Sequence, residues 1–247
     1  VQAELKVGSA GWQLEPPVKQ RLLERIRGAG VPLGEFVGGK FFYGIKTGLN
    51  EAFVIDGATK ARLIAEDARS AEVIKPYLRG RDVKRWRVGG QDLWVIFTRR
   101  GTVIDDYPAI ENHLAAFREQ LEPKPNSWRE EVDGTWPGRK GGTYKWFEIQ
   151  DNLAYWREFA KPKIVYPDIA LSPQFAWDSI GYYNVNTTYM IPAVEKWLLI
   201  VLNSVVSAWF YEQISPQIQN GYFRFISQYC EQIPIPQPSR SQQVASN

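Results

Sequence analysis

LWVIF, residues 93–97, is a continuous apolar run of strand length and marks the centre of the expected sheet. Upstream, AFVI at 52–55 indicates a second strand, because the turn-forming pair DG follows it directly. Downstream, KIVY at 163–166 and TYMI at 188–191 share the β-branched and aromatic composition of strands. The spacing between these runs is too irregular for repeated βαβ units. The sequence therefore predicts an α/β (α+β) fold, with a mixed, largely antiparallel sheet and packed helices.

Helical spacing of apolar residues predicts the elements that pack on this sheet. We expect an amphipathic helix over residues 18–28 and short helices over 59–67 and 71–77. A longer helix is expected from residue 107 to 121, where a proline stops it. The strongest helical pattern covers residues 194–213.

Three regions are expected along the chain. Residues 1–35 are interpreted as a lead-in helix and linker from a missing upstream domain, because the chain starts abruptly at a valine. Residues 36–238 form one folded domain. The Ser- and Gln-rich residues 239–247 are expected to be a disordered tail.

Composition limits the class of protein. The 247 residues are 44% hydrophobic and 14% aromatic, which is typical of a globular chain with a substantial core. A single cysteine, Cys230, excludes an internal disulfide and a thiolate metal cage, and it fits a reducing, cytoplasmic setting. The longest uncharged apolar stretch, residues 197–211, is shorter than the roughly twenty residues that span a bilayer, so we expect no membrane contact.

Positive charge is concentrated in one part of the chain although the net charge is only +3. Residues 79–100 contain seven basic residues and two acidic ones, interleaved with Trp86, Trp94 and Phe97. Residues 138–146 repeat this mixture with three glycines. Cations neutralise phosphates, and aromatic groups and glycines allow close approach to the backbone and bases of DNA. The pattern predicts a protein that binds nucleic acid.

The turn around Gly80 carries the first candidate base contacts. Arg79 and Arg81 flank this glycine, and each guanidinium could fork onto a guanine edge or a phosphate. The alternative is that one of the two pairs with Asp82 to hold the turn.

Other polar residues extend the candidate surface, and each has a structural alternative. Lys84, Arg85 and Arg87 suit phosphates, or form an ordinary solvated face. Asn50 could bond adenine, although a role in a turn is the more common one for asparagine. The glycine-rich loop 138–145 could be ordered by a target sequence, or be a plain surface loop. The full set of candidate DNA contacts is Lys46, Asn50, Arg79, Arg81, Lys84, Arg85, Arg87, Arg99, Arg139, Lys140, Tyr144, Lys145, Asn184 and Asn186.

Catalytic motifs are missing from the sequence. The single histidine, His113, has no nucleophile motif near it, and we expect it to be a partly exposed helix residue. Asp106, followed by Glu122 and Lys124, matches the Asp and Glu-x-Lys residue pattern of a metal-dependent nuclease site. The intervening Pro123 would break the strand on which such a pair is mounted. The sequence therefore predicts no catalytic residue and no metal ligand in this chain.

Several stretches together resemble the C-terminal target-recognition domain of TaqI-like and Eco57I-like restriction-modification proteins. These proteins are adenine-specific DNA methyltransferases, often fused to a nuclease. The matching stretches, in order, are 44–55, 74–83, 107–108, Trp156 with 161–165, 202–204 and 233–236. The basic insert around residues 139–145 matches no motif of the family, as expected of a region that varies with the target sequence.

The resemblance implies that residues 36–238 are a DNA target-recognition domain, a type II specificity module that is not catalytic in isolation. Its implied partners are double-stranded DNA and an upstream methyltransferase domain or subunit. S-adenosylmethionine would bind in that missing catalytic part, with Mg²⁺ where a nuclease is fused, and this chain would hold no cofactor. The Asn-Pro-Pro-Tyr motif that holds the flipped adenine does not occur in this sequence. Two alternatives remain: a protein-interaction module of a phage-defence complex, and a stand-alone nuclease that uses Asp106, Glu122 and Lys124.

Overall fold

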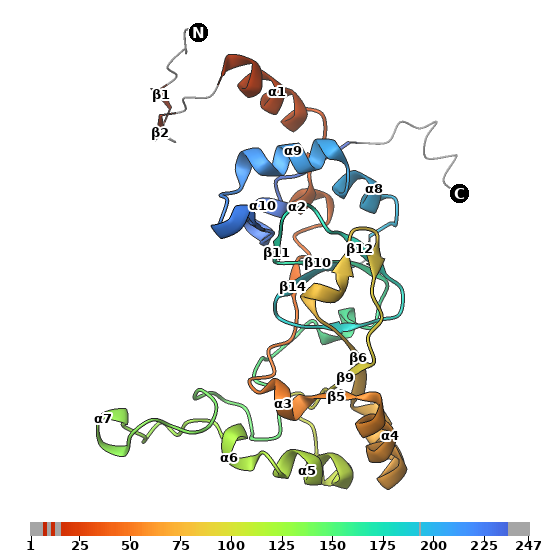
Figure 1. Cartoon of the computed structure of the whole chain (residues 1–247), viewed down its shortest axis with the longest axis vertical. Coiled ribbons are helices and arrows are strands. Elements are labelled where there is room, and N and C mark those ends of the chain that lie inside the picture. The colour runs from red at the N-terminus through yellow and green to blue at the C-terminus, as the bar shows by residue number, and fades with distance from the viewer. Residues whose placement is uncertain (1–6, 9–10, 13–15, 193, 237–247) are drawn as a thin grey trace.

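The structure is a computed structural model that describes residues 7–8, 11–12, 16–192 and 194–236. The expected tail, residues 239–247, lies outside the described residues, as do residues 1–6, 9–10 and 13–15 of the expected lead-in. Two hydrophobic cores lie along the long axis of the molecule, each built around a four-stranded sheet (Figure 1).

The first sheet contains the LWVIF stretch. Its strand order is β13 (Tyr183–Asn184), β6 (Ile74–Leu78), β9 (Leu93–Ile96) and β5 (Val54–Asp56). Strand β9 pairs antiparallel with both of its neighbours, and β13 pairs parallel with β6. Val95 and Ile96 are fully buried, which confirms the expected central strand.

The helix expected over residues 71–77 is wrong. A 3₁₀ helix, η1 (Ala68–Glu72), ends one residue before β6 begins at Ile74. Pro76 has no N–H for a helix interior, and it fits β6 because β13 pairs only with the last two residues of that strand.

The second sheet is entirely antiparallel. Its order is β12 (Ala176–Asp178), β10 (Lys163–Pro167), β14 (Thr188–Pro192) and β4 (Phe42–Tyr43). All five residues of β10 are buried, as expected for its apolar residues, and Lys163 at its start is buried with them. With one parallel pairing among the named strands, the α/β architecture with largely antiparallel pairing is confirmed.

Four two-stranded ribbons complete the strands. They are β1 (Val7–Gly8) with β2 (Gly11–Trp12), β3 (Val31–Pro32) with β16 (Pro234–Ile235), β7 (Val83–Lys84) with β8 (Arg87–Val88), and β11 (Ile169–Ala170) with β15 (Phe223–Arg224). The β3–β16 pair joins residues 31–32 to the end of the described chain. The expected boundary at residue 36 stays a prediction.

Helices cover the two cores at opposite ends of Figure 1. The first core is covered by α3 (Asn50–Phe53), α4 (Gly57–Glu66), α5 (Pro108–Ala115) and α6 (Arg118–Leu121). The second is covered by α1 (Pro17–Arg27), α2 (Leu33–Phe36), α8 (Leu198–Leu202), α9 (Val205–Ile214) and α10 (Ser227–Cys230). The remaining short elements are α7 (Glu130–Asp133), η2 (Gly80–Asp82), η3 (Ile104–Asp106), η4 (Trp156–Glu158) and η5 (Gln219–Gly221).

The helix expected over 194–213 is two helices. Asn203 ends α8, and its side chain brackets the backbone of Phe175, donating to O (2.8 Å) and accepting from N (3.1 Å). Ser204 then caps α9 by accepting from Ser207 N (3.1 Å). Within the described ranges, no helix is both long and apolar enough to cross a membrane.

Candidate nucleic-acid interface

A cleft of about 460 Å³ opens where the ends of the first sheet meet the loop after β13. Its lining includes Asn50 from the start of α3, the turn of Arg79, Gly80 and Arg81 after β6, and Asn186. The cleft therefore brings together four of the candidate contacts from three separate parts of the sequence.

The turn at the mouth of the cleft is held by an ion pair. Arg79 Nε lies 2.9 Å from Asp82 Oδ2, and Arg79 Nη2 lies 3.3 Å from Asp82 Oδ1. Asp82 is buried and Arg79 is half-buried, so this guanidinium already has a structural partner. The alternative in which an arginine pairs with Asp82 is correct for Arg79. Arg81 is exposed and has no side-chain partner within the described part of the chain.

Gly80 allows the turn to approach the opposite wall. A Cβ at this position would lie 3.3 Å from Thr187 O, tighter than ordinary van der Waals contact. On that wall, Asn186 is exposed, and its backbone N–H is bonded to Ile45 O (3.0 Å). Its side-chain amide has no hydrogen bond to any described residue, and the residue lines the cleft. The Asn50 amide oxygen accepts from Thr47 Oγ1 (2.8 Å) at the start of α3, and the residue also lines the cleft.

The basic residues after the cleft form a short hairpin, β7–β8. Lys84, Arg85 and Arg87 are all exposed. Arg85 Nη2 donates to Asn203 O (2.5 Å), which fixes the hairpin to the end of α8. The side chains of Lys84 and Arg87 have no ion pair or hydrogen bond to any described residue, so both remain available to phosphates.

Lys46 and Arg99 are further exposed cations. The backbone N–H of Lys46 donates to Asp151 Oδ2 (3.2 Å). Burial raises the pKa of the Asp151 carboxyl, and this backbone bond and the Lys46 ammonium oppose part of the increase. The Arg99 guanidinium lies 4.5 Å from the centre of the Trp156 ring, a cation–π distance. Arg99 also donates to the Arg100 carbonyl (3.1 Å).

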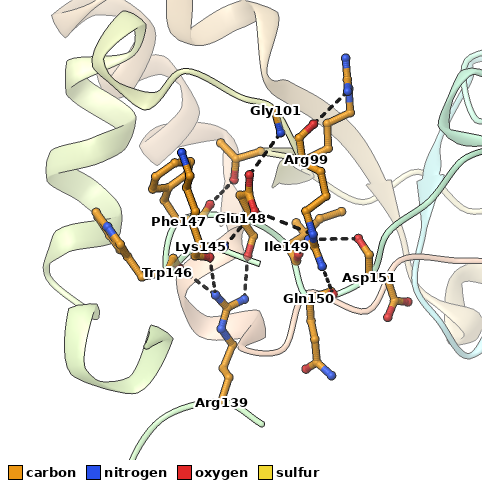
Figure 2. A network of polar contacts seen from close by, with 12 residues as sticks. Arg99, Gly101, Arg139, Lys145, Trp146, Phe147, Glu148, Ile149, Gln150 and Asp151 are labelled. Atoms are coloured by element: carbon orange, nitrogen blue, oxygen red, sulfur yellow. Dashed lines mark hydrogen bonds and ion pairs between the residues drawn. The ribbon is translucent and has the colours of Figure 1, made fainter. Parts of the chain in front are cut away.

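Arg139 is not placed to contact DNA, which corrects the expectation for this residue. It is 4% exposed, and its guanidinium donates to five backbone carbonyls: Leu121 (2.8 Å), Thr47 (3.0 Å), Lys145 (3.2 Å), Trp146 (2.8 Å) and Glu148 (2.7 Å). Figure 2 shows this guanidinium pointing into the turn of residues 145–148. Burial lowers its pKa to about 10.

The rest of the glycine-rich loop divides between the interior and the surface. Tyr144 is buried, and its hydroxyl donates to the Lys140 carbonyl, so this ring is also wrongly assigned to DNA. Lys140 and Lys145 are exposed, so both side chains remain accessible to phosphates. Arg139 attaches the loop to the first core through its hydrogen bonds to Leu121 and Thr47. The glycines of the loop therefore do not predict how it is held, because the buried guanidinium organises the backbone around it.

Asn184 is likewise buried rather than presented to bases. Its amide nitrogen donates to Thr188 Oγ1 (2.6 Å) and O (3.3 Å) inside the sheet. The neighbouring Tyr182 and Tyr183 are buried too.

The residues of the nuclease alternative do not form a site. Asp106 pairs with Arg69 (3.2 Å), Glu122 with Arg118 (2.5 Å) and Lys124 with Glu130 (2.7 Å). In the described part of the chain, no group of three or more His, Cys, Asp or Glu residues could hold a metal ion.

His113 has a structural contact of its own. The ring is partly buried, and its Nε2 lies 3.0 Å from the Ala52 carbonyl, so the tautomer protonated at Nε2 donates to it.

Sequence reasoning missed two polar residues that line the cleft, Tyr77 and Thr187. Tyr77 is 2% exposed, and its hydroxyl has no hydrogen-bond partner among the described residues; burial raises its pKa. Thr187 lies opposite Gly80. Tyr77 stands inside the quoted stretch 74–83, but nothing in its spacing distinguishes a cleft-lining tyrosine from a core one.

Comparison with known proteins shows the family of this chain. Residues 75–235 match the family described as the TaqI-like C-terminal specificity domain. The chain belongs to this family. The resemblance inferred from its sequence motifs is thereby confirmed.

Two curated relatives are longer proteins. The type II methyltransferase M.PaeR7I of Pseudomonas aeruginosa is 27% identical over 95% of this chain and 38% of its own length. The type II methyltransferase M.BanIII of Aneurinibacillus aneurinilyticus is 25% identical over 79% of this chain and 34% of its own length. The chain thus spans a little over a third of the relatives it matches.

A solved structure shares the fold of this specificity domain. The Type IIL restriction-modification enzyme MmeI, in a complex with DNA, aligns with a TM-score of 0.55 and 15% identity over 83% of this chain and 26% of that chain.

Proposed function

We propose that this chain is the double-stranded DNA sequence-recognition module of a type II restriction-modification adenine methyltransferase and is not catalytic by itself. Membership of the TaqI-like specificity family and the similarity to type II methyltransferases support this proposal. S-adenosylmethionine would bind in the methyltransferase part, which this chain does not include. The module would hold the duplex while that part extracts an adenine.

The observation that carries the proposal is the combination of the cleft with unpaired exposed cations. Arg81 stands at the cleft, and Lys84 and Arg87 follow it on the hairpin. Unpaired cations are suited to phosphates because no internal ion pair must break when DNA binds. The free amide of Asn186, together with Asn50, is suited to base edges, where amides bond adenine bidentately. Lys46, Arg99, Lys140 and Lys145 are proposed as outer phosphate contacts.

Selection from a pool of duplexes with a randomised 12-base-pair centre tests the proposal. We expect the full chain to enrich one short motif. The Asn186→Ala variant should relax the preference at one position, by about 1–3 kcal/mol of discrimination. The Arg62→Ala variant is the matched control, because Arg62 pairs with Glu66 on the exposed face of α4, outside the cleft lining. A chain that binds no duplex would contradict the proposal and favour a protein-interaction module.

A further inference from the structure

The loop of the β7–β8 hairpin has an unusual backbone conformation. Lys84 pairs with Arg87, which leaves the two-residue loop Arg85-Trp86. Trp86 has a φ of +77°, in the left-handed region that favours glycine. Asn220, with a φ of +60°, is the other non-glycine residue with positive φ in the described ranges. Asparagine tolerates this region, whereas a bulky aromatic residue is strained in it.

Burial offsets only part of this strain, because Trp86 is 45% exposed. Surrounding contacts hold the loop in place: Trp86 N donates to Phe175 O (2.9 Å), and Arg85 Nη2 donates to Asn203 O (2.5 Å). The Asn203 side chain fixes both backbone polar groups of Phe175. The fold therefore holds an exposed aromatic ring in a defined position, at a cost to stability, which is typical of a functional element.

Charge identifies the kind of partner that this ring fits. The three residues around it, Lys84, Arg85 and Arg87, are cationic and exposed, and the Arg85 guanidinium lies 5.3 Å from the centre of the ring. A rigid aromatic ring flanked by cations is complementary to a base between two phosphates.

We infer that Trp86 inserts at a base step of the bound duplex and stacks on a base, while Lys84 and Arg87 contact the flanking phosphates. This inference rests on the proposed DNA recognition and adds a wedge to it. Insertion would unstack one base step, and the free-energy cost of unstacking is smallest at steps that kink easily. Trp86 would therefore contribute to the choice of target sequence without a hydrogen bond to a base.

Glycine and asparagine replacements test the wedge. Trp86→Gly and Trp86→Asn remove the ring and accept the left-handed backbone, so both should melt no lower than the wild-type chain. Trp86→Phe keeps a ring. Asn220→Gly is the control, since it places a glycine at the other exposed non-glycine position with positive φ, outside the cationic hairpin. The probe is the duplex selected by the wild-type chain, with 2-aminopurine placed at successive positions.

We expect Trp86→Gly and Trp86→Asn to weaken binding about fivefold or more, the smallest effect expected when one stacked ring is lost. The wild-type chain and Trp86→Phe should raise 2-aminopurine fluorescence at one step, and the two ringless variants should not. Wild-type affinity and fluorescence in Trp86→Gly would overturn the wedge while leaving DNA recognition intact. Failure of the wild-type chain to bind any duplex would instead overturn the proposed function.

Discussion

At the scale of single residues, Arg139 shows how burial changes the role of a charge. Its five carbonyl partners come from α6, from the segment before α3 and from residues 145–148, so one side chain closes the loop onto the first core. Arg139→Met should lower the free energy of unfolding by about 3 kcal/mol or more, because buried carbonyls lose their donors. Urea denaturation measures the change. The exposed neighbour Lys140→Met should shift stability by less than about 0.5 kcal/mol.

His113 predicts a pH dependence of stability. Burial lowers the pKa of its imidazole below the ordinary value of 6.5. The unfolded chain therefore binds a proton first as the pH falls, and stability declines below about pH 6.5 until the folded ring is also protonated. His113→Gln should flatten the stability profile between pH 7 and pH 5, measured by thermal unfolding. An unchanged slope in this variant would contradict the contribution of His113.

Residue roles were the least predictable part of the site. Arg79 and Arg81 are equivalent in the sequence, yet one is paired with a buried aspartate and the other is free. Arg139 occurs in a polar stretch that predicts a surface, yet it is buried by contacts with residues distant in sequence, such as Thr47. Asn184 is buried because β13 pairs with β6, where it lies opposite Leu78. Local pattern gives the chemistry of a side chain, whereas burial depends on tertiary contacts.

At the scale of elements, a buried ion pair joins β10 to β12. Lys163 Nζ lies 2.5 Å from Asp178 Oδ2, and both side chains are fully buried. The Asp178 carboxylate also accepts from the backbone N–H groups of residues 180–182. Asp178→Ala leaves a buried ammonium without its counter-ion and should cost about 3–5 kcal/mol of stability. Glu158→Ala, at the exposed Lys161 pair, is the control and should cost less than about 1 kcal/mol in the same denaturation assay.

Strands were predicted better than helices. The apolar runs at 93–97, 163–166 and 188–191 form strands because their side chains are buried on the sheets. The run at 52–55 is partly wrong, since α3 takes its first two residues and β5 begins at Val54. The apolar periodicity predicted one helix over 107–121 and one over 194–213, whereas each range contains two helices in the structure. The interruptions depend on tertiary contacts, such as that of Asn203 with Phe175.

At the scale of the whole molecule, the two cores and the segments that join them bring distant parts of the chain to one surface. Stretch 74–83 supplies the turn at the cleft, and residue 50 and the loop at 185–187 supply the facing walls. The hairpin that follows the turn is attached to the second core through Arg85 and Asn203. The basic pattern of the sequence predicted that a DNA-binding surface exists, and the fold determines which of its residues share a cleft.

The salt dependence of DNA binding tests the central claim, that unpaired cations at the cleft and hairpin bind a duplex. The association constant of the wild-type chain should fall steeply with salt. In the triple variant Arg81→Ala, Lys84→Ala, Arg87→Ala, the slope of log K against log salt concentration should be smaller by about 0.9 for each cation removed. Arg62→Ala should keep the wild-type slope. An identical slope in the triple variant, or binding by the wild-type chain that does not respond to salt, would contradict the account.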